Sequence, residues 1–448
     1  MIDRRAKRLC LFLGLWLALL LCSCSANIMP GNMTDPLRAP TLNKKQAEVS
    51  AALTATLNLA EIVYRYPQSG ANRTPFLFRD INGDGSEEAF VFYSFTARPG
   101  EVRLKVLSQS EEGQWFSLYD IAGQGDQVEF VDFVQLTSLE GPDLLVGWLN
   151  SGRQERFLEM VSLSADNEIV QTQYKYVAYA VADGGQSRLS RLILATQESR
   201  GAPFEVKLMG QRNGGFRQMD SLWLYEEVAA VLQMTQGSLW DKSSGIYLDE
   251  LLDNDTVATE ILRLNSEGLE LVAGGGEGPE SEKMRYYLET FRPDRILSVD
   301  INRDGVVEIP KADSLPGIDE SDVGTPLVST VYWRPEEGGL VEAVRAVANS
   351  RAGYLMVLPQ RWVTDVTVVD YPEANQRSFH ILNPRTMLPE TELLRIITMN
   401  HDSIQQYSGD YILLGERGAV QYYGFLPKAT NEPLSLTVGE LRELFVLL

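Results

Sequence analysis

Two distant stretches, Asp80-Ile-Asn-Gly-Asp-Gly-Ser-Glu-Glu88 and Asp300-Ile-Asn-Arg-Asp-Gly-Val-Val-Glu308, share the pattern D-I-N-x-D-G-x-x-E. Each follows a short run typical of a strand, Phe-Leu-Phe-Arg in the first case and Ile-Leu-Ser-Val in the second. Near-identical segments far apart in one chain indicate an internal repeat. With weaker copies in 130–148 and at 241–245, the anchors recur every ~50–65 residues, about the length of a four-stranded propeller blade.

The rest of the chain, up to about residue 370, has the pattern of short strands. Runs rich in Val, Ile, Leu, Phe, Tyr and Trp alternate with turns of Gly, Asp, Asn and Ser, and few stretches have helical periodicity. Many short strands at even spacing are typical of an antiparallel sandwich, barrel or propeller. We therefore expect a mainly β fold, a β-propeller-like array of short antiparallel sheets, over residues 43–370.

Helices are expected near the two ends of this array. Asn43 with Gln46 matches a capping box, and an apolar stripe at helical spacing follows it. Thr437 with Glu440 matches a second box, before a closing helix whose apolar face would include Leu441, Leu444, Phe445 and Leu448. We expect an N-terminal helix before the sheets, and a small α+β C-terminal unit over residues 371–448.

The first residues have the features of an export signal. Four basic side chains precede a 13-residue apolar run, Leu9–Leu21, and a bilayer span would need about 20 residues. The run ends in Leu-Cys-Ser-Cys, which resembles the lipobox of bacterial lipoproteins. The resemblance implies that residues 1–23 are a signal peptide and that Cys24 is diacylated, with Cys22 as the alternative. An ordinary secretory signal or a membrane anchor would also fit the apolar run.

The composition after this signal agrees with export. All three cysteines lie within the first 24 residues, so the mature chain would have no disulfide and no Cys nucleophile. Residues 24–42 are rich in Pro and small polar residues, which predicts a flexible tether. Because two acyl chains give stable attachment, we expect an extracytoplasmic protein held at the bacterial cell membrane by its lipidated cysteine.

The two acidic stretches are the main chemical signal. Oxygen-bearing groups at loop positions 1, 3, 5, 7 and 9, with Gly at position 6, suit Ca²⁺, which binds six to eight oxygens. The ligands would be Asp80, Asn82, Asp84, the Ser86 carbonyl and Glu88 in the first loop, and Asp300, Asn302, Asp304, the Val306 carbonyl and Glu308 in the second. We predict a structural Ca²⁺; an ordinary hairpin turn is the alternative, since Asn-Gly and Asp-Gly favour turns.

The setting of these loops bears on the fold. Neither loop has the Glu that EF-hands place at position 12, so a helix–loop–helix unit is not expected. Strand–loop–strand repeats with this motif resemble the FG-GAP/VCBS-type repeats of integrin-α-like β-propellers, whose calcium loops read D-x-[DN]-x-D-G-x-x-D. The resemblance covers about ten residues in each of two places and implies propeller blades with calcium loops. Position 9 departs from the family, because it is Glu rather than Asp.

Charge and missing motifs limit the function. Lys+Arg 40 against Asp+Glu 61 gives a net charge of −21, which argues against nucleic acid as a partner. Two His leave little for His-based chemistry, and no G-x-S-x-G, H-E-x-x-H or P-loop string occurs. We predict no catalytic residue and expect a binding or scaffolding module for an envelope protein or a glycan.

Two other functions share the predicted location. A solute-binding lipoprotein of an importer would alternate strands and helices through two α/β lobes. A carboxylate-dependent envelope glycoside hydrolase would show two facing acids in a deep aromatic-lined cleft, one of them with a raised pKa.

Overall fold

The computed structural model describes residues 42–57, 60–138, 140–183, 188–266, 268–275, 281–292, 295–317, 328–349, 351–400, 410–427 and 433–447. The predicted signal peptide and Cys24 lie outside these residues, as does all of the tether except Leu42. In the part of the chain that is described, no helix combines the length and the hydropathy that crossing a bilayer requires. The described residues up to Ala51 and those from Ala52 onward belong to two separate compact units.

The expected N-terminal helix is present as α2 (Lys44–Thr56). Asn43 Oδ1 accepts a hydrogen bond from the Gln46 amide at 2.9 Å, and Gln46 Oε1 accepts one from the Asn43 amide at 3.1 Å. These reciprocal bonds satisfy amides that have no partner inside the helix. The predicted capping box is confirmed, and Val49 and Leu53 of the apolar stripe are buried.

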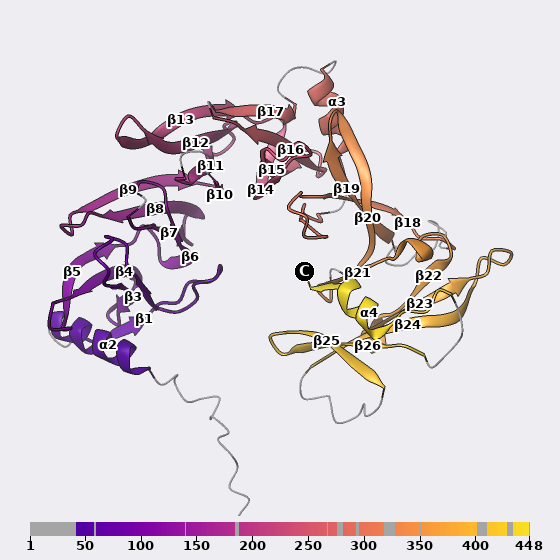
Figure 1. Cartoon of the computed structure of the whole chain (residues 1–448), viewed down its shortest axis with the longest axis horizontal. Coiled ribbons are helices and arrows are strands. Elements are labelled where there is room, and N and C mark those ends of the chain that lie inside the picture. The colour runs from indigo at the N-terminus through magenta and orange to yellow at the C-terminus, as the bar shows by residue number, and fades with distance from the viewer. Residues whose placement is uncertain are drawn as a thin grey trace, which may run out of the picture. The chain divides into compact units, whose positions relative to one another are not determined.

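The described strands form six antiparallel sheets, and Figure 1 labels most of these strands. Sheet 1 contains β1 (Ile62–Tyr64), β2 (Phe76–Arg79), β3 (Glu88–Phe95), β4 (Arg98–Gln109) and β5 (Trp115–Ala122). Sheet 2 contains β6 (Gln127–Val134), β7 (Asp143–Asn150), β8 (Glu155–Leu163) and β9 (Ile169–Tyr176). Sheet 3 contains β10 (Ala178–Ala182), β11 (Arg191–Gln197), β12 (Phe204–Arg212) and β13 (Gly215–Trp223).

The later sheets continue this order along the chain. Sheet 4 contains β14 (Val228–Ser238), β15 (Ser244–Leu252), β16 (Val257–Leu264) and β17 (Leu269–Ala273), followed by α3 (Glu282–Glu289). Sheet 5 contains β18 (Ile309–Ser314), β19 (Val328–Glu336), β20 (Gly339–Asn349), β21 (Tyr354–Val357) and β27 (Phe445–Leu447). Sheet 6 contains β22 (Val366–Tyr371), β23 (Gln376–Leu382), β24 (Pro389–Asn400), β25 (Tyr411–Arg417) and β26 (Val420–Phe425). Two 3₁₀ turns, η2 (Gln360–Trp362) and η3 (Pro372–Ala374), and helix α4 (Val438–Leu444) complete the described elements.

Each sheet shares an apolar core with the next one. Separate clusters of buried side chains join sheets 1 and 2, sheets 2 and 3, sheets 3 and 4, sheets 4 and 5, and sheets 5 and 6. A strand projects alternate residues to its two faces, so sheets between two neighbours are apolar on both. The expected mainly β array of short antiparallel sheets is confirmed, while its closure into a propeller ring stays a prediction.

The C-terminal segment differs in detail from the expectation. The predicted boundary between residues 370 and 371 falls inside β22, and sheet 6 already begins at Val366. The closing helix is shorter than expected: α4 ends at Leu444, and Phe445 starts β27. The reason is tertiary pairing, since β27 hydrogen-bonds with β21 of sheet 5 and places Phe445 opposite Met356. An apolar residue fits the sequence pattern of a helix face and that of a buried strand equally well, so the pattern does not distinguish them.

Helix α4 should be part of the core rather than an accessory. Leu441 is fully buried among side chains of sheets 5 and 6. We predict that Leu441→Ala lowers the free energy of unfolding by about 2–5 kcal/mol, because it removes buried methyl groups and leaves a cavity. Urea denaturation would measure the change. Leu388→Ala is the control, since Leu388 is 61% exposed and should change stability by no more than about 0.5 kcal/mol. Equal effects of the two variants would contradict the prediction.

Candidate metal centre

The two acidic stretches are hairpin loops at equivalent places in sheets 1 and 5. Arg79 pairs with Glu88 across β2 and β3, and Val299 pairs with Glu308 in an antiparallel bridge just before β18. The closing pair therefore spans nine positions in both loops, 79 to 88 and 299 to 308. The predicted strand–loop–strand setting is confirmed for the first loop, whereas the second loop is entered through an isolated bridge at Val299 and leads into β18.

The backbone follows the same path in both loops. Position 4 is left-handed, with φ of 77° at Gly83 and 62° at Arg303. Position 6 is left-handed too, with φ of 89° at Gly85 and 90° at Gly305. Glycine adopts this conformation without the steric penalty that a Cβ brings, which explains the Gly at position 6 of the motif.

Side chains of the second loop accept hydrogen bonds from the loop's own backbone and so fix its shape. Asp300 Oδ2 accepts from the Gly305 amide at 2.9 Å, and Asp304 Oδ1 accepts from the Val306 amide at 2.8 Å. Asn302 Oδ1 accepts from the Asp304 amide at 2.9 Å. The other oxygens are used inside the loop as well, since Asp300 Oδ1 accepts from the Asp304 amide at 3.1 Å and Asp304 Oδ2 accepts from Asn302 Nδ2 at 3.0 Å. The loop is therefore ordered by its own side chains.

The first loop repeats these bonds residue for residue. Asp80 Oδ2 accepts from Gly85 at 2.9 Å, Asp84 Oδ1 accepts from Ser86 at 2.7 Å, and Asn82 Oδ1 accepts from Asp84 at 3.0 Å. One added contact links this loop to sheet 2, because Asn82 Nδ2 also donates to Asn167 Oδ1 at 3.0 Å.

The acid at position 9 ties each loop to the sheet. Glu88 Oε2 accepts from the Ile81 amide, and Glu308 Oε2 accepts from the Ile301 amide, each at 3.0 Å. Both carboxyls are fully buried. Burial raises the pKa of Glu308 to about 7, and the charges of Asp304 and Asp300 add to the rise while the Ile301 hydrogen bond opposes it. Burial likewise raises the pKa of Glu88.

The two loops differ in what contacts the second carboxylate oxygen of the acid at position 9. Glu88 Oε1 accepts a long hydrogen bond from Ser108 Oγ at 3.4 Å. Glu308 Oε1 is buried and has no hydrogen-bond partner among the described residues. The neighbouring register fits the contrast: Ala89 pairs with Leu107, the residue before Ser108, whereas Ile309 pairs with Trp333, the residue before Arg334. The Arg334 guanidinium donates to Glu336 instead.

Three acids converge at the second loop. One carboxylate oxygen from each of Asp300, Asp304 and Glu308 lies within 4.8 Å of the others. Across the described ranges, no other group of three His, Cys, Asp or Glu ligand atoms comes as close. The Val306 backbone bridges to Ser238 of β14, whose amide donates to the Gly305 carbonyl at 2.7 Å. The neighbouring sheet therefore holds the loop in place from outside.

A third copy of the loop lies between β6 and β7, where the sequence predicted one without its acids. Val134 pairs with Asp143, again nine positions apart (134 to 143). Asp143 Oδ2 accepts from the Leu136 amide at 2.9 Å, and Oδ1 accepts from Thr137 Oγ1 at 2.6 Å and from Ser162 Oγ. Hydroxyl groups thus satisfy the buried acid here. Sequence reasoning missed Ser162, because it lies on another strand and only the register brings it opposite Asp143.

The other predicted copy, at residues 241–245, differs from these loops. The turn between β14 and β15 is closed by Ser238 and Ser244, only six positions apart (238 to 244). Asp241 accepts from the Ser243 amide at 2.9 Å inside this tighter turn. The closing pair that is again nine positions apart joins Ala182 of β10 and Arg191 of β11.

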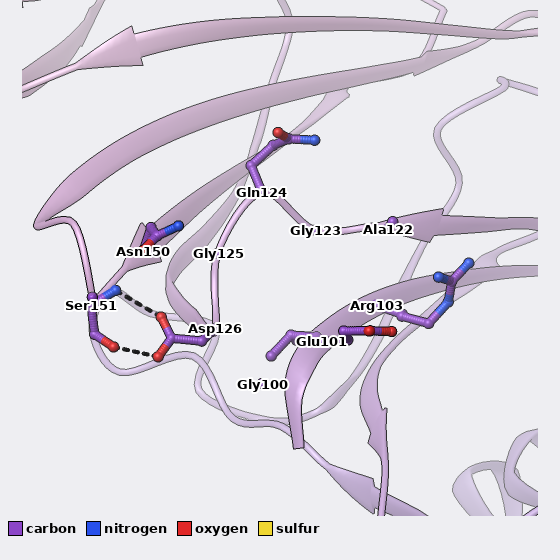
Figure 2. A pocket seen from close by; sticks show the side chains of 12 residues that line it. Gly100, Glu101, Arg103, Ala122, Gly123, Gln124, Gly125, Asp126, Asn150 and Ser151 are labelled. Carbon is purple, nitrogen blue, oxygen red and sulfur yellow. Dashed lines mark hydrogen bonds between the residues drawn. The ribbon is translucent and has the colours of Figure 1, made fainter. Parts of the chain in front are cut away.

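A pocket of about 560 Å³ opens beside sheets 1 and 2 (Figure 2). Its charged side chains already have partners: Asp126 accepts from the Ser151 amide at 2.7 Å and from the Ser151 hydroxyl, and Arg103 pairs with Asp120 at 2.8 Å. The Ser151 bonds lower the pKa of Asp126. Gly123 is needed for packing, because a Cβ there would lie 2.5 Å from the Trp148 ring. The pocket therefore presents polar backbone and charged side chains that are already paired.

No family model matches the chain, and no curated protein matches its sequence. Among solved structures, a rhamnogalacturonan lyase from Bacillus licheniformis is 10% identical with a TM-score of 0.33, and the match covers 71% of this chain and 55% of that chain. This chain thus spans about half the length of that lyase. An exo-β-1,3-galactanase from Phanerochaete chrysosporium is 9% identical with a TM-score of 0.28, over 79% of this chain and 82% of that chain.

The hydroxyls around Asp143 should be needed for stability. We predict that Ser162→Ala lowers the free energy of unfolding by about 1–2 kcal/mol, because the buried Asp143 carboxylate loses a donor. Urea denaturation tests this. Ser199→Ala, an exposed serine in the turn between β11 and β12, is the control and should stay within about 0.5 kcal/mol of the wild type. A Ser162 variant as stable as the control would show that the hydroxyl is not needed.

Proposed function

We propose that the chain is a membrane-anchored extracytoplasmic lipoprotein whose β body is a non-catalytic binding or scaffolding module, stabilised by Ca²⁺ in its D-x-N-x-D-G-x-x-E loops. The observation that carries the calcium part is the buried Glu308 Oε1, which has no partner among the described residues and belongs to the convergent acids of the second loop. A buried carboxylate oxygen without a donor or a cation is costly.

A divalent cation fits this donor set. Asp300, Asp304 and Glu308 would supply carboxylate oxygens, with Asn302 and the Val306 carbonyl adding neutral ones. Ca²⁺ prefers such hard oxygen ligands and accepts irregular geometry, with water filling the remaining positions. The bound ion would neutralise the crowded acids and hold the loop closed, so that binding and folding are coupled. Arg334 Nη1 lies 3.8 Å from Asp304 Oδ2, but both side chains are too exposed for this pair to replace an ion.

The first loop would bind more weakly. The same residue types are present at Asp80, Asn82, Asp84, Ser86 and Glu88. Ser108 already contacts the free oxygen of Glu88, so less is gained when an ion replaces that contact. We therefore expect the second loop to fill first.

The location and the partner class follow from the sequence. The lipobox-like segment places the lipid on Cys24, and the strong net negative charge disfavours nucleic acid. An envelope protein or a glycan is the class of partner that such a location offers. The α/β lobes of a solute-binding lipoprotein are not what the described sheets form.

Calcium should stabilise the folded protein through the second loop. We predict that saturating Ca²⁺ raises the midpoint of thermal unfolding of the chelator-treated protein by about 5 °C, as expected when a ligand binds only the native state. Asp300→Asn and Asp304→Asn should lose most of this rise, and Asp84→Asn should lose less. Asp255→Asn, which changes an exposed turn acid that pairs with Arg295, should keep all of it. Absence of both heat in calorimetry and a thermal shift in the wild type would refute the proposal.

The anchor has a separate test. We predict that Cys24→Ser moves the full-length protein, expressed in a bacterium, from the membrane fraction to the soluble extracytoplasmic fraction, because no acyl chains are attached. Cys22→Ser is the matched control and should leave the protein in the membrane fraction. Fractionation and labelling with an acyl-chain precursor would measure both. If the Cys24→Ser variant keeps the label while the Cys22→Ser variant loses it, the lipid is instead attached to Cys22.

A further inference from the structure

Two acids project into the apolar core between sheets 3 and 4. Register places Glu250 of β15 opposite Ala258, and Glu260 of β16 opposite Leu248. Residues 248 and 250 share a face of β15, so the two acids are diagonal neighbours on one face of sheet 4. The other residues on this face belong to the apolar cluster: Ile246, Leu248, Leu252, Ala258 and Leu262.

Each acid uses one oxygen and leaves the other without a partner. Glu250 Oε2 accepts from Tyr287 Oη of α3 at 2.8 Å, and Glu260 Oε1 accepts from the Tyr225 amide at 3.0 Å. Glu250 is 0% exposed and Glu260 is 1% exposed. Glu250 Oε1 and Glu260 Oε2 have no hydrogen-bond partner in the described part of the chain.

No basic side chain neutralises these acids. Among the described residues, neither carboxyl forms an ion pair with Lys, Arg or His. The buried Arg292 guanidinium lies on the opposite face of sheet 4, where it pairs with Asp249 at 2.7 Å. Two unpaired charges on an apolar face would be very costly. The pair must therefore be neutralised by a proton or by a metal ion.

The surroundings suit a proton better than a metal ion. The groups facing the acids are hydrogen-bond donors and carbon: Tyr287 from α3, Tyr225 from the segment before β14, and Gly274, where a Cβ would lie 3.0 Å from Glu260 Oε2. Ca²⁺ would need six to eight oxygens, and only the two carboxyls offer free ones. The other charged group nearby is Asp249, whose negative charge disfavours ionisation of Glu250.

We propose that Glu250 and Glu260 form a buried proton-binding pair that holds sheet 4 against α3 while it is protonated. The pair links three elements, since Glu250 bonds Tyr287 of α3 and Glu260 bonds the backbone at Tyr225 and, at 3.4 Å, at Gly275. Loss of the proton leaves negative charge on the apolar face, where desolvation and the repulsion between the two acids outweigh the hydrogen bonds that the carboxyls accept. Both carboxyls are closed to solvent, so the pair does not act as the two catalytic acids of a hydrolase.

The direction of the pH effect follows from the environment. Burial raises the pKa of Glu260 to about 7, and burial together with the neighbouring Glu260 charge raises the pKa of Glu250 well above its ordinary value of 4.5. A carboxyl with a raised pKa in the folded state binds protons more tightly there than in the unfolded chain. Its contribution is therefore complete below pH 4.5 and is lost as the pH rises through about 7.

The test compares isosteric variants over a pH series. Glutamine imitates the protonated acid, so Glu250→Gln and Glu260→Gln should unfold near the wild-type temperature at pH ~5.5 and at least ~3 °C above it at pH ~8.5. Glu270→Gln is the control, since Glu270 lies on β17 of the same sheet and is an exposed partner of Arg263. It should follow the wild type at every pH. Running each series with Ca²⁺ and with chelator separates this effect from the calcium loops, because the difference between variant and wild type should be the same in both.

Infrared spectroscopy gives a direct reading of the proton. The wild type at pH ~6 should show the C=O band of a protonated carboxylic acid, with an amplitude that falls in the Glu260→Gln variant and with rising pH. An unchanged band in both single variants, or an identical pH response of wild type and variants, would overturn the proposal. If one variant does not fold, the other decides the outcome. If the part of the band that the Glu260→Gln variant loses appears only when the protein is metal-free, a cation and not a proton occupies the pair.

Discussion

A buried carboxylate that accepts the backbone amide seven positions before it fixes the hairpin loop of three sheets. The bond joins Ile81 to Glu88, Leu136 to Asp143, and Ile301 to Glu308. Each bond satisfies one oxygen and leaves the other buried, where an unmet acceptor is costly. The three sheets then differ in what meets that second oxygen. In sheet 2 two hydroxyls donate hydrogen bonds to it. In sheet 1 one hydroxyl donates a longer bond, and in sheet 5 no described protein group donates to it.

The same constraint governs the interior of sheet 4, with different solutions on its two faces. On one face, Asp249 is fully paired by the Arg292 guanidinium, the Ser298 amide and hydroxyl, and the Thr259 hydroxyl. On the other face, Glu250 and Glu260 have donors for only half of their oxygens. A buried acid inside a sheet therefore needs a guanidinium, a set of hydroxyls, a cation or a proton. Which of these it has decides how the sheet responds to salt, to calcium and to pH.

The local features of this chain could be predicted, and the pairing between distant strands could not. The D-x-N-x-D-G motif predicted the loop, and Asn43 with Gln46 predicted the start of α2, because both depend on residues a few positions apart. Ser162 and Arg334 contact their loops only through strand register, which no local pattern encodes. Phe445 fits a helix face as well as it fits the strand that it forms. Glu250 and Glu260 could not be selected from 61 acids without knowing that they share an apolar face.

The pairing of β27 with β21 sets an order of assembly. Sheets 1 to 4 are each made from one continuous stretch of sequence, whereas sheet 5 takes its fifth strand from beyond sheet 6. During synthesis, the earlier sheets can close as they emerge, but the edge of β21 stays open until Phe445–Leu447 arrives. An open edge of this kind is where strands from other chains pair wrongly. Nascent chains stalled or truncated before this strand would therefore be the form most prone to aggregate.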